Sequence, residues 1–455
     1  MNGACFKAYD IRGRVGEELN EDLAWRIGRA MSEQLRASRI VVGADMRLSS
    51  PGLSNALSEG ILSTGADVID IGLSGTEEVY FATVYHQADG GVQITASHTP
   101  ADYNGMKLVR AGARPISGDS GLFDIRDQVL ANRFPDGQRR GQRVRQPDKR
   151  PYIRHLLHLV DCQPLDGFCM VSNAGNGAIG PALDVLMEEL AGRGIHPLLH
   201  RYHDTPDGTF PNGVPNPLLP ENRADTCEAV RQHGAQLGVA FDGDFDRCFF
   251  FDEHGDFVES YYIIGLLANA LLADQPGGTI IHDPRLTWST IDTVLEAGGH
   301  PMQSKTGHAF IKERMRHDNA LYGGEMSGHH YFRDFYYCDS GILPWLYLSR
   351  LLASSGQTLS SLVRDKAHRY PVSGEINFTV ADTQAAVTRI REQYRHSALS
   401  EDNTDGISLE FSDWRFNVRA SNTEPLIRLN VETRCNPELL ASKTRELSSL
   451  LGGAA

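Results

Sequence analysis

Residues 39–72 read RIVVGADMRLSSPGLSNALSEGILSTGADVIDIG: an apolar strand, a polar loop, a helical stretch, a glycine and a second apolar strand. The same order returns in GFCMVSNAGNGAIGPALDVLMEELAGRGIHPLL at 167–199 and in GTIIHDPRLTWSTIDTVLEAGGHPMQS at 278–304. Each copy is typical of a βαβ unit, in which a helix connects two parallel strands. Because the copies begin roughly one domain length apart, they predict three related α/β domains with mixed, largely parallel sheets. Three units within a single sheet are the alternative.

The composition is that of a folded chain with several domains. Of the 455 residues, 41% are hydrophobic and 22% are charged, and the net charge is −14. That charge argues against a general nucleic-acid binder and against docking on an anionic membrane. The longest apolar run, 261–273, is too short to span a membrane and predicts a buried helix. The seven cysteines form no CxxC pair and residues 1–13 lack an apolar signal core, so we expect a reduced, cytoplasmic setting.

Changes of composition indicate where the domains meet. Residues 132–151 are polar and rich in arginine, which predicts an interdomain linker; a phosphate-binding patch is the alternative. Residues 204–222 hold five prolines, and a long stiffened loop of this kind is often functional. Towards the C-terminus the pattern mixes helices with strands near 407–411 and 415–418. We therefore expect α/β domains at 1–145, 146–250 and 251–370, and a smaller α+β domain at 371–455.

Four polar loops follow apolar strands, and the first is TASHTP at 95–100. Ligands of open α/β sheets gather beyond the carboxyl ends of strands, so four such loops can converge on one cleft. A serine beside a histidine is a candidate nucleophile, yet neighbouring residues of an extended chain point to opposite sides. We therefore do not expect Ser97 and His98 alone to form a dyad, and a plain Ser/Thr turn remains the alternative.

The second loop, DGDFDR at 242–247, places three carboxylates at alternate positions between two apolar stretches. Asp242, Asp244 and Asp246 favour a hard cation such as Mg²⁺ or Ca²⁺. An EF-hand is excluded because Arg247 stands where that loop needs glycine and because both flanks resemble strands. Three acids packed between apolar strands are costly without a cation, so the loop predicts a metal that bridges to a phosphoryl group.

The remaining two loops suit a phosphorylated sugar. GEMSGHH at 324–330 offers an acid, a hydroxyl and imidazoles for hydrogen bonds to a polyhydroxy ligand; an ordinary polar loop is the alternative. RASNTEP at 419–425, with Arg428, offers two arginines and two hydroxyls as a phosphate cradle; a hairpin turn with surface arginines is the alternative. Together the four loops predict phosphoryl transfer on a phosphosugar.

In this order and spacing, the loops resemble those of the α-D-phosphohexomutase superfamily. The resemblance spans almost the whole chain, from KAYDIRG at 7–13 to the loop at 419–425. GEMSGH is similar to the phosphomannomutase subfamily, including its phosphomannomutase/phosphoglucomutase members. The runs at 74–83 and 304–332 are similar to bacterial enzymes that supply GDP-mannose for capsule and exopolysaccharide. The resemblance implies three related α/β domains and a smaller C-terminal α+β domain around a central cleft.

The resemblance also implies roles for single residues. Ser97 would be the phosphoserine, Glu325 and Ser327 would read sugar hydroxyls, and Arg285 stands where related bifunctional enzymes have lysine. Thr99 replaces the usual asparagine, which puts loop order and phosphoserine hydrolysis in question. The implied metal ligands are Ser97, Asp242, Asp244 and Asp246. The implied catalytic residues are Ser97, His98, Lys107, Arg247, His329 and Arg12. The implied substrate-binding residues are Tyr9, Arg285, His308, Glu325, Ser327, Arg419, Ser421, Asn422, Thr423 and Arg428.

The implied enzyme is an intramolecular phosphotransferase that interconverts mannose 6-phosphate and mannose 1-phosphate. It would act through a phosphoserine and a hexose 1,6-bisphosphate intermediate, with Mg²⁺ as cofactor and the bisphosphate as activator, and would supply GDP-mannose. Its partners would be phosphosugars, with no nucleic acid and no membrane, and both a monomer and a homodimer remain open. The alternatives are a bifunctional or mainly glucose-specific phosphoglucomutase, a phosphosugar phosphatase and a non-catalytic phosphosugar sensor.

Overall fold

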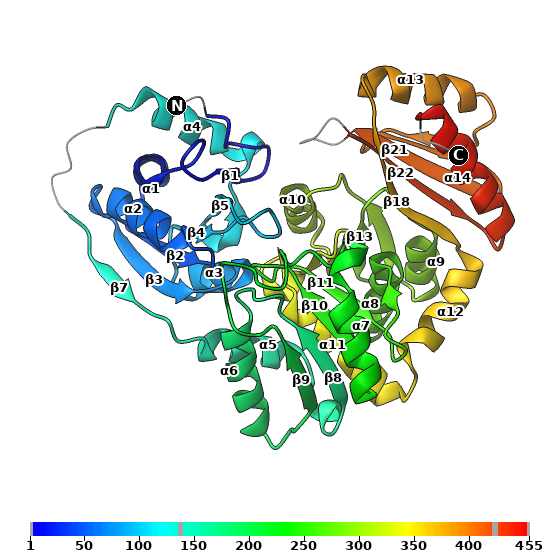
Figure 1. Cartoon of the computed structure of the whole chain (residues 1–455), viewed down its shortest axis with the longest axis horizontal. Helices are drawn as coiled ribbons and strands as arrows, with labels where there is room; N and C mark the ends of the chain where they lie inside the picture. Colours follow the sequence, from blue (N-terminus) through cyan, green and yellow to red (C-terminus); the bar gives the residue numbers. More distant parts are fainter. Residues whose placement is uncertain (1–2, 135–139, 421–425, 453–455) are drawn as a thin grey trace. The chain divides into compact units, whose positions relative to one another are not determined.

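The computed structural model describes residues 3–134, 140–420 and 426–452 (Figure 1). By their internal contacts these residues form two compact units. The first unit comprises Met1–Phe257 and His329–Gly356, and the second comprises Val258–Gly328 and Gln357–Ala455. The chain therefore passes between the units three times.

The N-terminal sheet is mixed and contains the first predicted βαβ unit. β2 (Arg39–Ala44) is parallel to β3 (Asp67–Leu73) and to β4 (Gly90–Ile94), and α2 (Ser50–Leu62) connects β2 to β3. β5 (Tyr103–Arg110) runs antiparallel to β4. The strand order is β1-β5-β4-β2-β3-β7, with β6 beside β5. The other strands are β1 (Ile11–Arg14), β6 (Arg114–Pro115) and β7 (Arg143–Arg145).

Helices cover both faces of this sheet (Figure 1). α1 (Glu21–Leu35), α2 and α4 (Leu122–Ala131) share a core with Val42 on one face. α3 (Thr76–Tyr85) packs against Val41 on the other face. Successive side chains of a strand point to opposite faces, which is why an uninterrupted apolar strand such as β2 needs cover on both sides.

The arginine-rich stretch predicted as a linker also extends this sheet. Its residues Arg143–Arg145 form β7, an exposed strand parallel to β3. Arg143 pairs with Asp70 at 2.9 Å, and Lys149 pairs with Glu78 at 2.6 Å. These two cations are matched to carboxylates of the N-terminal sheet and of α3, which speaks against the alternative of a phosphate-binding patch there.

The second predicted unit lies in a sheet of strand order β12-β11-β10-β8-β9. β8 (Cys169–Asn173) is parallel to β9 (Leu198–Tyr202), with α6 (Gly180–Ala191) between them in the chain, and β10 (Leu237–Phe241) is parallel to β8. β10 runs antiparallel to β11 (Cys248–Phe251), and the DGDFDR turn joins them. The other elements are β12 (Phe257–Val258), α5 (Arg150–Leu159) and α7 (Ala224–His233).

The first unit is completed by the segment 329–356. β16 (His330–Phe332) pairs antiparallel with β17 (Cys338–Asp339), and α11 (Ile342–Ser355) follows. The start of α11 is held by α3, because Glu77 Oε1 accepts hydrogen bonds from the N–H groups of Gly341 at 3.2 Å and Ile342 at 3.3 Å. A carboxylate at a helix N-terminus satisfies donors that have no partner within the helix.

The second unit contains the third predicted unit. β13 (Thr279–His282) is parallel to β14 (His300–Gln303), with α9 (Trp288–Glu296) between them in the chain, and to β15 (Tyr322–Gly324). All three predicted βαβ units are thus confirmed, each in its own sheet. The predicted buried helix is α8 (Ser260–Asp274). The other helices are α10 (His308–Asp318) and α12 (Leu359–Arg369).

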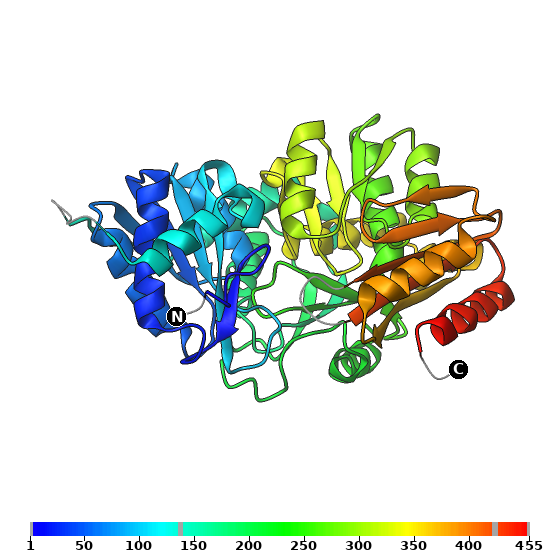
Figure 2. The ribbon, with the colours of Figure 1, turned by 90° about the horizontal axis from the view of Figure 1, so that it is seen from above.

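The C-terminal part of this unit is an α+β fold (Figure 2). The predicted strand pair is present as β20 (Ile407–Glu410) antiparallel to β21 (Trp414–Ala420). The strand order is β18-β22-β21-β20-β19, and two helices share one apolar core with this sheet. The other elements are β18 (Val372–Thr379), β19 (Ser400–Asp402), β22 (Leu426–Thr433), α13 (Thr383–Tyr394) and α14 (Pro437–Leu450).

Two further observations bear on the sequence expectations. Among the described residues, no helix combines the length and the apolar character that a membrane crossing requires. All seven cysteines lie within the described residues and carry free thiols. The predicted domain boundaries themselves stay a prediction.

Candidate functional site

Ser97 lies just beyond the end of β4 and is held from three sides. Its side chain is buried, and its Oγ donates a hydrogen bond to Asp242 Oδ2 at 2.6 Å. Arg247 Nη2 donates to the same Oγ at 3.0 Å, and His98 Nδ1 lies 2.9 Å from it. The serine hydroxyl is therefore oriented by a carboxylate, a guanidinium and an imidazole, as a phosphoryl acceptor requires.

That Ser97 and His98 alone form no dyad stays a prediction, but the geometric premise behind it, that their side chains point to opposite sides, is wrong. It assumed an extended backbone, whereas Ser97 has a left-handed conformation with φ of 51°. This turn brings both side chains to the same side of the loop. A serine in this region costs on the order of 1 kcal/mol, and such strained residues are found at active sites.

The surroundings of His98 favour its neutral form. Burial lowers its pKa well below the usual value, and the charges of Arg247 and Arg12 add to this effect. A neutral imidazole offers Nδ1 as an acceptor when the proton is on Nε2. Arg12 itself lies on β1 opposite Gly105 and pairs with Asp10 at 2.9 Å, and Tyr9 is half-buried just before it.

The three aspartates of the DGDFDR turn come together as predicted. Asp242, Asp244 and Asp246 are each 1% exposed or less, and one oxygen from each lies within 4.8 Å of the others. Phe245 between them is buried with φ of 44°, which turns the loop sharply.

The chemistry of this cluster fits a hard divalent cation. Asp244 Oδ1 and Asp246 Oδ1 are buried and accept no hydrogen bond from the described residues. Buried carboxylate oxygens without donors are costly, and a cation such as Mg²⁺ satisfies them. Asp242, Asp244 and Asp246, with the Ser97 oxygen beside Asp242, are the residues that would hold it.

Lys107 on β5 reaches into the same cluster. Its Nζ lies 2.7 Å from Asp244 Oδ2 and also contacts Asp246. Burial opposes the charge of Lys107, but the two aspartates outweigh it and raise the pKa of the lysine. The pKa of Asp244 is lowered, because Lys107 and a hydrogen bond from Thr76 outweigh burial, whereas burial and the Asp244 charge raise the pKa of Asp246. Lys107 is therefore an ammonium ion at this site.

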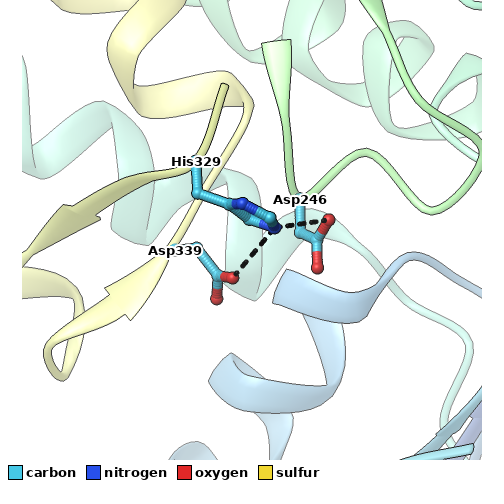
Figure 3. A group of neighbouring side chains, drawn as sticks. All are labelled: Asp246, His329 and Asp339. Atoms are coloured by element: carbon cyan, nitrogen blue, oxygen red, sulfur yellow. Dashed lines mark ion pairs between the residues drawn. The ribbon is translucent and has the colours of Figure 1, made fainter. Parts of the chain in front are cut away.

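The side chain of His329 lies between Asp339 and Asp246 of the DGDFDR turn, which we call the metal loop (Figure 3). Its Nε2 lies 3.8 Å from Asp246 Oδ1 and 3.9 Å from Asp339 Oδ2, and its backbone forms a β-bridge with Arg247. Asp339, which is fully buried on β17, was missed by sequence reasoning, since no motif surrounds it. The β16–β17 hairpin brings it beside His329.

Three further residues predicted to bind substrate gather in the second unit around a carboxylate that the sequence analysis did not select. Glu375 lies 3.3 Å from Arg285 Nη1, 3.3 Å from Arg419 Nη2 and 3.4 Å from Arg428 Nη1. Burial raises the pKa of Glu375, but the three arginines outweigh it and lower that pKa. Three guanidinium groups around one acid form a strongly cationic surface suited to a phosphate. The predicted residues Ser421, Asn422 and Thr423 lie outside the described residues.

Glu325 is fixed close to the start of α10. It is 3% exposed, and its Oε1 accepts a hydrogen bond from Gly307 N at 2.8 Å, directly before His308. The N–H of Met326 donates to Asp283 Oδ2 at 2.9 Å, and Asp283 also binds Arg285. These contacts connect the GEMSGHH loop to the start of α10 and to the arginine cluster within one unit. Ser327 is half-buried in that loop.

Four family profiles match the chain. They are the phosphoglucomutase/phosphomannomutase alpha/beta/alpha domains I, II and III, at residues 3–136, 150–255 and 259–370, and the C-terminal domain at 375–446.

Relatives match over nearly the full length. A phosphomannomutase of Escherichia coli (strain K12) is 56% identical over 449 residues, which is 98% of both chains. A protein named phosphohexose mutases from Xanthomonas campestris pv. campestris is 56% identical over 453 residues, which is 100% of both. Among solved structures, a phosphoglucomutase/phosphomannomutase family protein from Burkholderia thailandensis superposes with a TM-score of 0.88 at 30% identity and covers 100% of this chain and 99% of that one.

Proposed function

This chain belongs to the phosphoglucomutase/phosphomannomutase family of intramolecular phosphotransferases, and from that premise we propose that it is a phosphomannomutase. It interconverts mannose 6-phosphate and mannose 1-phosphate through phosphorylated Ser97 and a hexose 1,6-bisphosphate. The full-length identity to curated phosphomannomutases supports the substrate. One observation carries the mechanism: the buried Ser97 hydroxyl contacts Asp242, Arg247 and His98 at once.

The proposed chemistry moves one phosphoryl group in each half-reaction. The bond between phosphorus and Ser97 Oγ breaks while a bond to the free sugar hydroxyl forms, and the hydroxyl proton passes to a base. His329 is the candidate base there, whereas Lys107, as an ammonium ion, is a candidate to stabilise negative charge beside the aspartates. Arg247 stabilises the charge near Ser97 Oγ. When bound by the aspartates, Mg²⁺ would neutralise charge on the transferring group.

The second half-reaction requires the bisphosphate to turn round and present its other phosphate to Ser97. The residues that hold the phosphate that is not being transferred must then accept either end of the sugar. Arg285, Arg419 and Arg428 suit this task, because guanidinium groups bind phosphate through several donors. Glu325, Ser327 and His308 are proposed to contact the sugar hydroxyls.

The setting proposed for this activity is cytoplasmic, with hexose 1,6-bisphosphate as activator that restores phosphorylated Ser97. Mannose 1-phosphate formed there supplies GDP-mannose for polysaccharide synthesis. Partners other than phosphosugars are not part of the proposal.

The test is turnover of mannose 1-phosphate and of glucose 1-phosphate, measured separately with Mg²⁺ and a trace of glucose 1,6-bisphosphate. Hexose 6-phosphate and free phosphate are followed together. Fast 6-phosphate formation from mannose 1-phosphate without phosphate release is the expected result. A preference for glucose 1-phosphate would make the enzyme a phosphoglucomutase, and phosphate release at the rate of substrate loss would make it a phosphatase.

A further inference from the structure

Arg47, in the loop between β2 and α2, lies beneath the Ser97 loop and is 1% exposed. Its Nη1 donates to the carbonyl oxygens of Pro100 at 2.7 Å and Tyr103 at 2.9 Å. Its Nη2 donates to those of Ser97 at 2.9 Å and Thr99 at 2.6 Å. The four terminal N–H bonds of one guanidinium therefore meet three carbonyls of the Ser97 loop and the carbonyl of Tyr103, at the start of β5.

Only arginine supplies this set of donors. Its terminal nitrogens carry four N–H bonds in one plane, whereas a lysine ammonium has three donors at one point. A buried charge is costly unless it is paired, and Asp45 Oδ2 lies 3.5 Å from Arg47 Nε. The Phe210 ring, from the proline-rich loop, has its centroid 5.1 Å from the guanidinium carbon.

The carbonyl of Ser97 is the decisive acceptor. Because Ser97 is left-handed, rotation of the peptide that follows it would redirect both Ser97 and His98. The metal loop approaches the same carbonyl closely, since a Cβ on Gly243 would lie 2.6 Å from Ser97 O. Thr99 adds a local contact, as its Oγ1 donates to Ala96 O at 2.6 Å. The peptide after Ser97 is thus fixed between Arg47 and the metal loop.

We propose that Arg47 is a positioning residue for the phosphoryl-transfer step: it fixes the main chain of the Ser97 loop so that the hydroxyl stays directed at Asp242 and Arg247. Arg47 acts through that loop. In the described contacts it binds neither the three aspartates of the metal loop nor the arginines around Glu375. This inference rests on the proposed function only in taking Ser97 as the phosphoryl carrier.

The test compares Arg47→Lys with Arg29→Lys. Arg29 is a buried arginine of the same domain that pairs with Glu33 and lies over the ring of Trp25, so it controls for loss of a buried guanidinium. Phosphoryl uptake on Ser97 from glucose 1,6-bisphosphate is followed by intact mass. The KM for mannose 1-phosphate is measured beside it.

A misplacement of the hydroxyl by about 1 Å is expected to slow uptake by about 100-fold in Arg47→Lys. The KM for mannose 1-phosphate should stay within about threefold, and Arg29→Lys should keep uptake within about threefold. Uptake in Arg47→Lys within that same range of the wild type would overturn the inference. So would an equal loss in both variants, because it would reflect general destabilisation of the domain.

If Arg47→Lys fails to fold, the double variant Asp45→Asn/Arg47→Gln, which removes both buried charges, takes its place with the same two outcomes. Addition of guanidinium ion to Arg47→Ala is an independent test. Phosphoryl uptake on Ser97 that is restored in this variant and unchanged in the wild type supports the positioning role. A variant whose uptake is not restored contradicts it. A wild-type protein that takes no phosphoryl group on Ser97 would instead refute the proposed function, so the two failures are distinguishable.

Discussion

The Ser97–aspartate cluster in the first unit and the arginine cluster in the second differ in burial and in precision. Ser97, Asp242 and Asp244 are nearly inaccessible to solvent, Ser97 Oγ donates to Asp242 at 2.6 Å, and Lys107 donates to Asp244 at 2.7 Å. In the second cluster Arg285 and Arg419 are also buried, but Glu375 and Arg428 keep side-chain exposures of 23% and 27%, and the ion-pair distances from Glu375 exceed 3 Å. A phosphoryl transfer requires the reacting atoms to be held in fixed positions. In the proposed mechanism, the residues that hold the other phosphate need positive charge but can accept the phosphate in more than one position.

Ser97→Ala is expected to have the largest effect, and to separate the roles of the two clusters. We expect sustained turnover to vanish, because the phosphoryl carrier is gone. Binding of mannose 1-phosphate, measured by calorimetry, should remain within about threefold, because the arginine cluster is untouched. Near-normal turnover would remove Ser97 from the mechanism.

Asp244→Asn is expected to have the next largest effect. It keeps the size of the side chain but removes a charge from the candidate cation site, and the affinity for Mn²⁺ should fall by about 10–100-fold. Binding is measured by electron paramagnetic resonance without substrate. The matched control is Asp252→Asn, since Asp252 closes a turn after β11 and lies outside the triad. Equal Mn²⁺ titrations of both variants and wild type would contradict the assignment.

Glu375→Gln examines the second cluster. The carboxylate holds three guanidinium groups together, so its loss should let them separate and raise the KM for mannose 1-phosphate by about 10-fold. The kcat should change by no more than about twofold, because no reacting atom is touched. A lower KM would mean instead that Glu375 competes with the phosphate for the arginines.

The smallest expected effect concerns acid stability of the first unit. Burial lowers the pKa of His330 to about 3, from 6.5. The unfolded chain therefore takes up this proton first, and stability is lost as the pH falls from 6.5 towards 3. At about pH 5 this amounts to about 2 kcal/mol. His330→Gln should flatten the fall of Tm over this range relative to wild type, and parallel Tm curves would rule the effect out.

Sequence periodicity captured much of the fold because each βαβ unit is locally encoded. The alternation of apolar strand, loop and amphipathic helix in 39–72, 167–199 and 278–304 required no knowledge of distant contacts. The strand β7 was missed because its sequence, Arg-Val-Arg, has no apolar pattern. Its pairing with β3 depends on backbone hydrogen bonds to residues distant in the chain.

The candidate site divides in the same way. The loops that carry Ser97, the aspartates and Glu325 follow strands and are visible as motifs, whereas Arg419, predicted to lie in such a loop, is on β21. Asp339, Glu375 and Arg47 stand in no motif that marks them. Glu375 and Arg47 acquire their places through contacts with residues distant in the chain, and the β16–β17 hairpin brings Asp339 beside His329.

By itself the sequence determined the three repeated units, the four polar loops and the acidic triad, because residue type and spacing fix local conformation. Only the tertiary structure decided that Ser97 is left-handed and faces His98, and that one buried arginine meets four carbonyls. The physical reason is that backbone strain and a buried charge persist only where the surrounding packing compensates them, and no local pattern records that compensation.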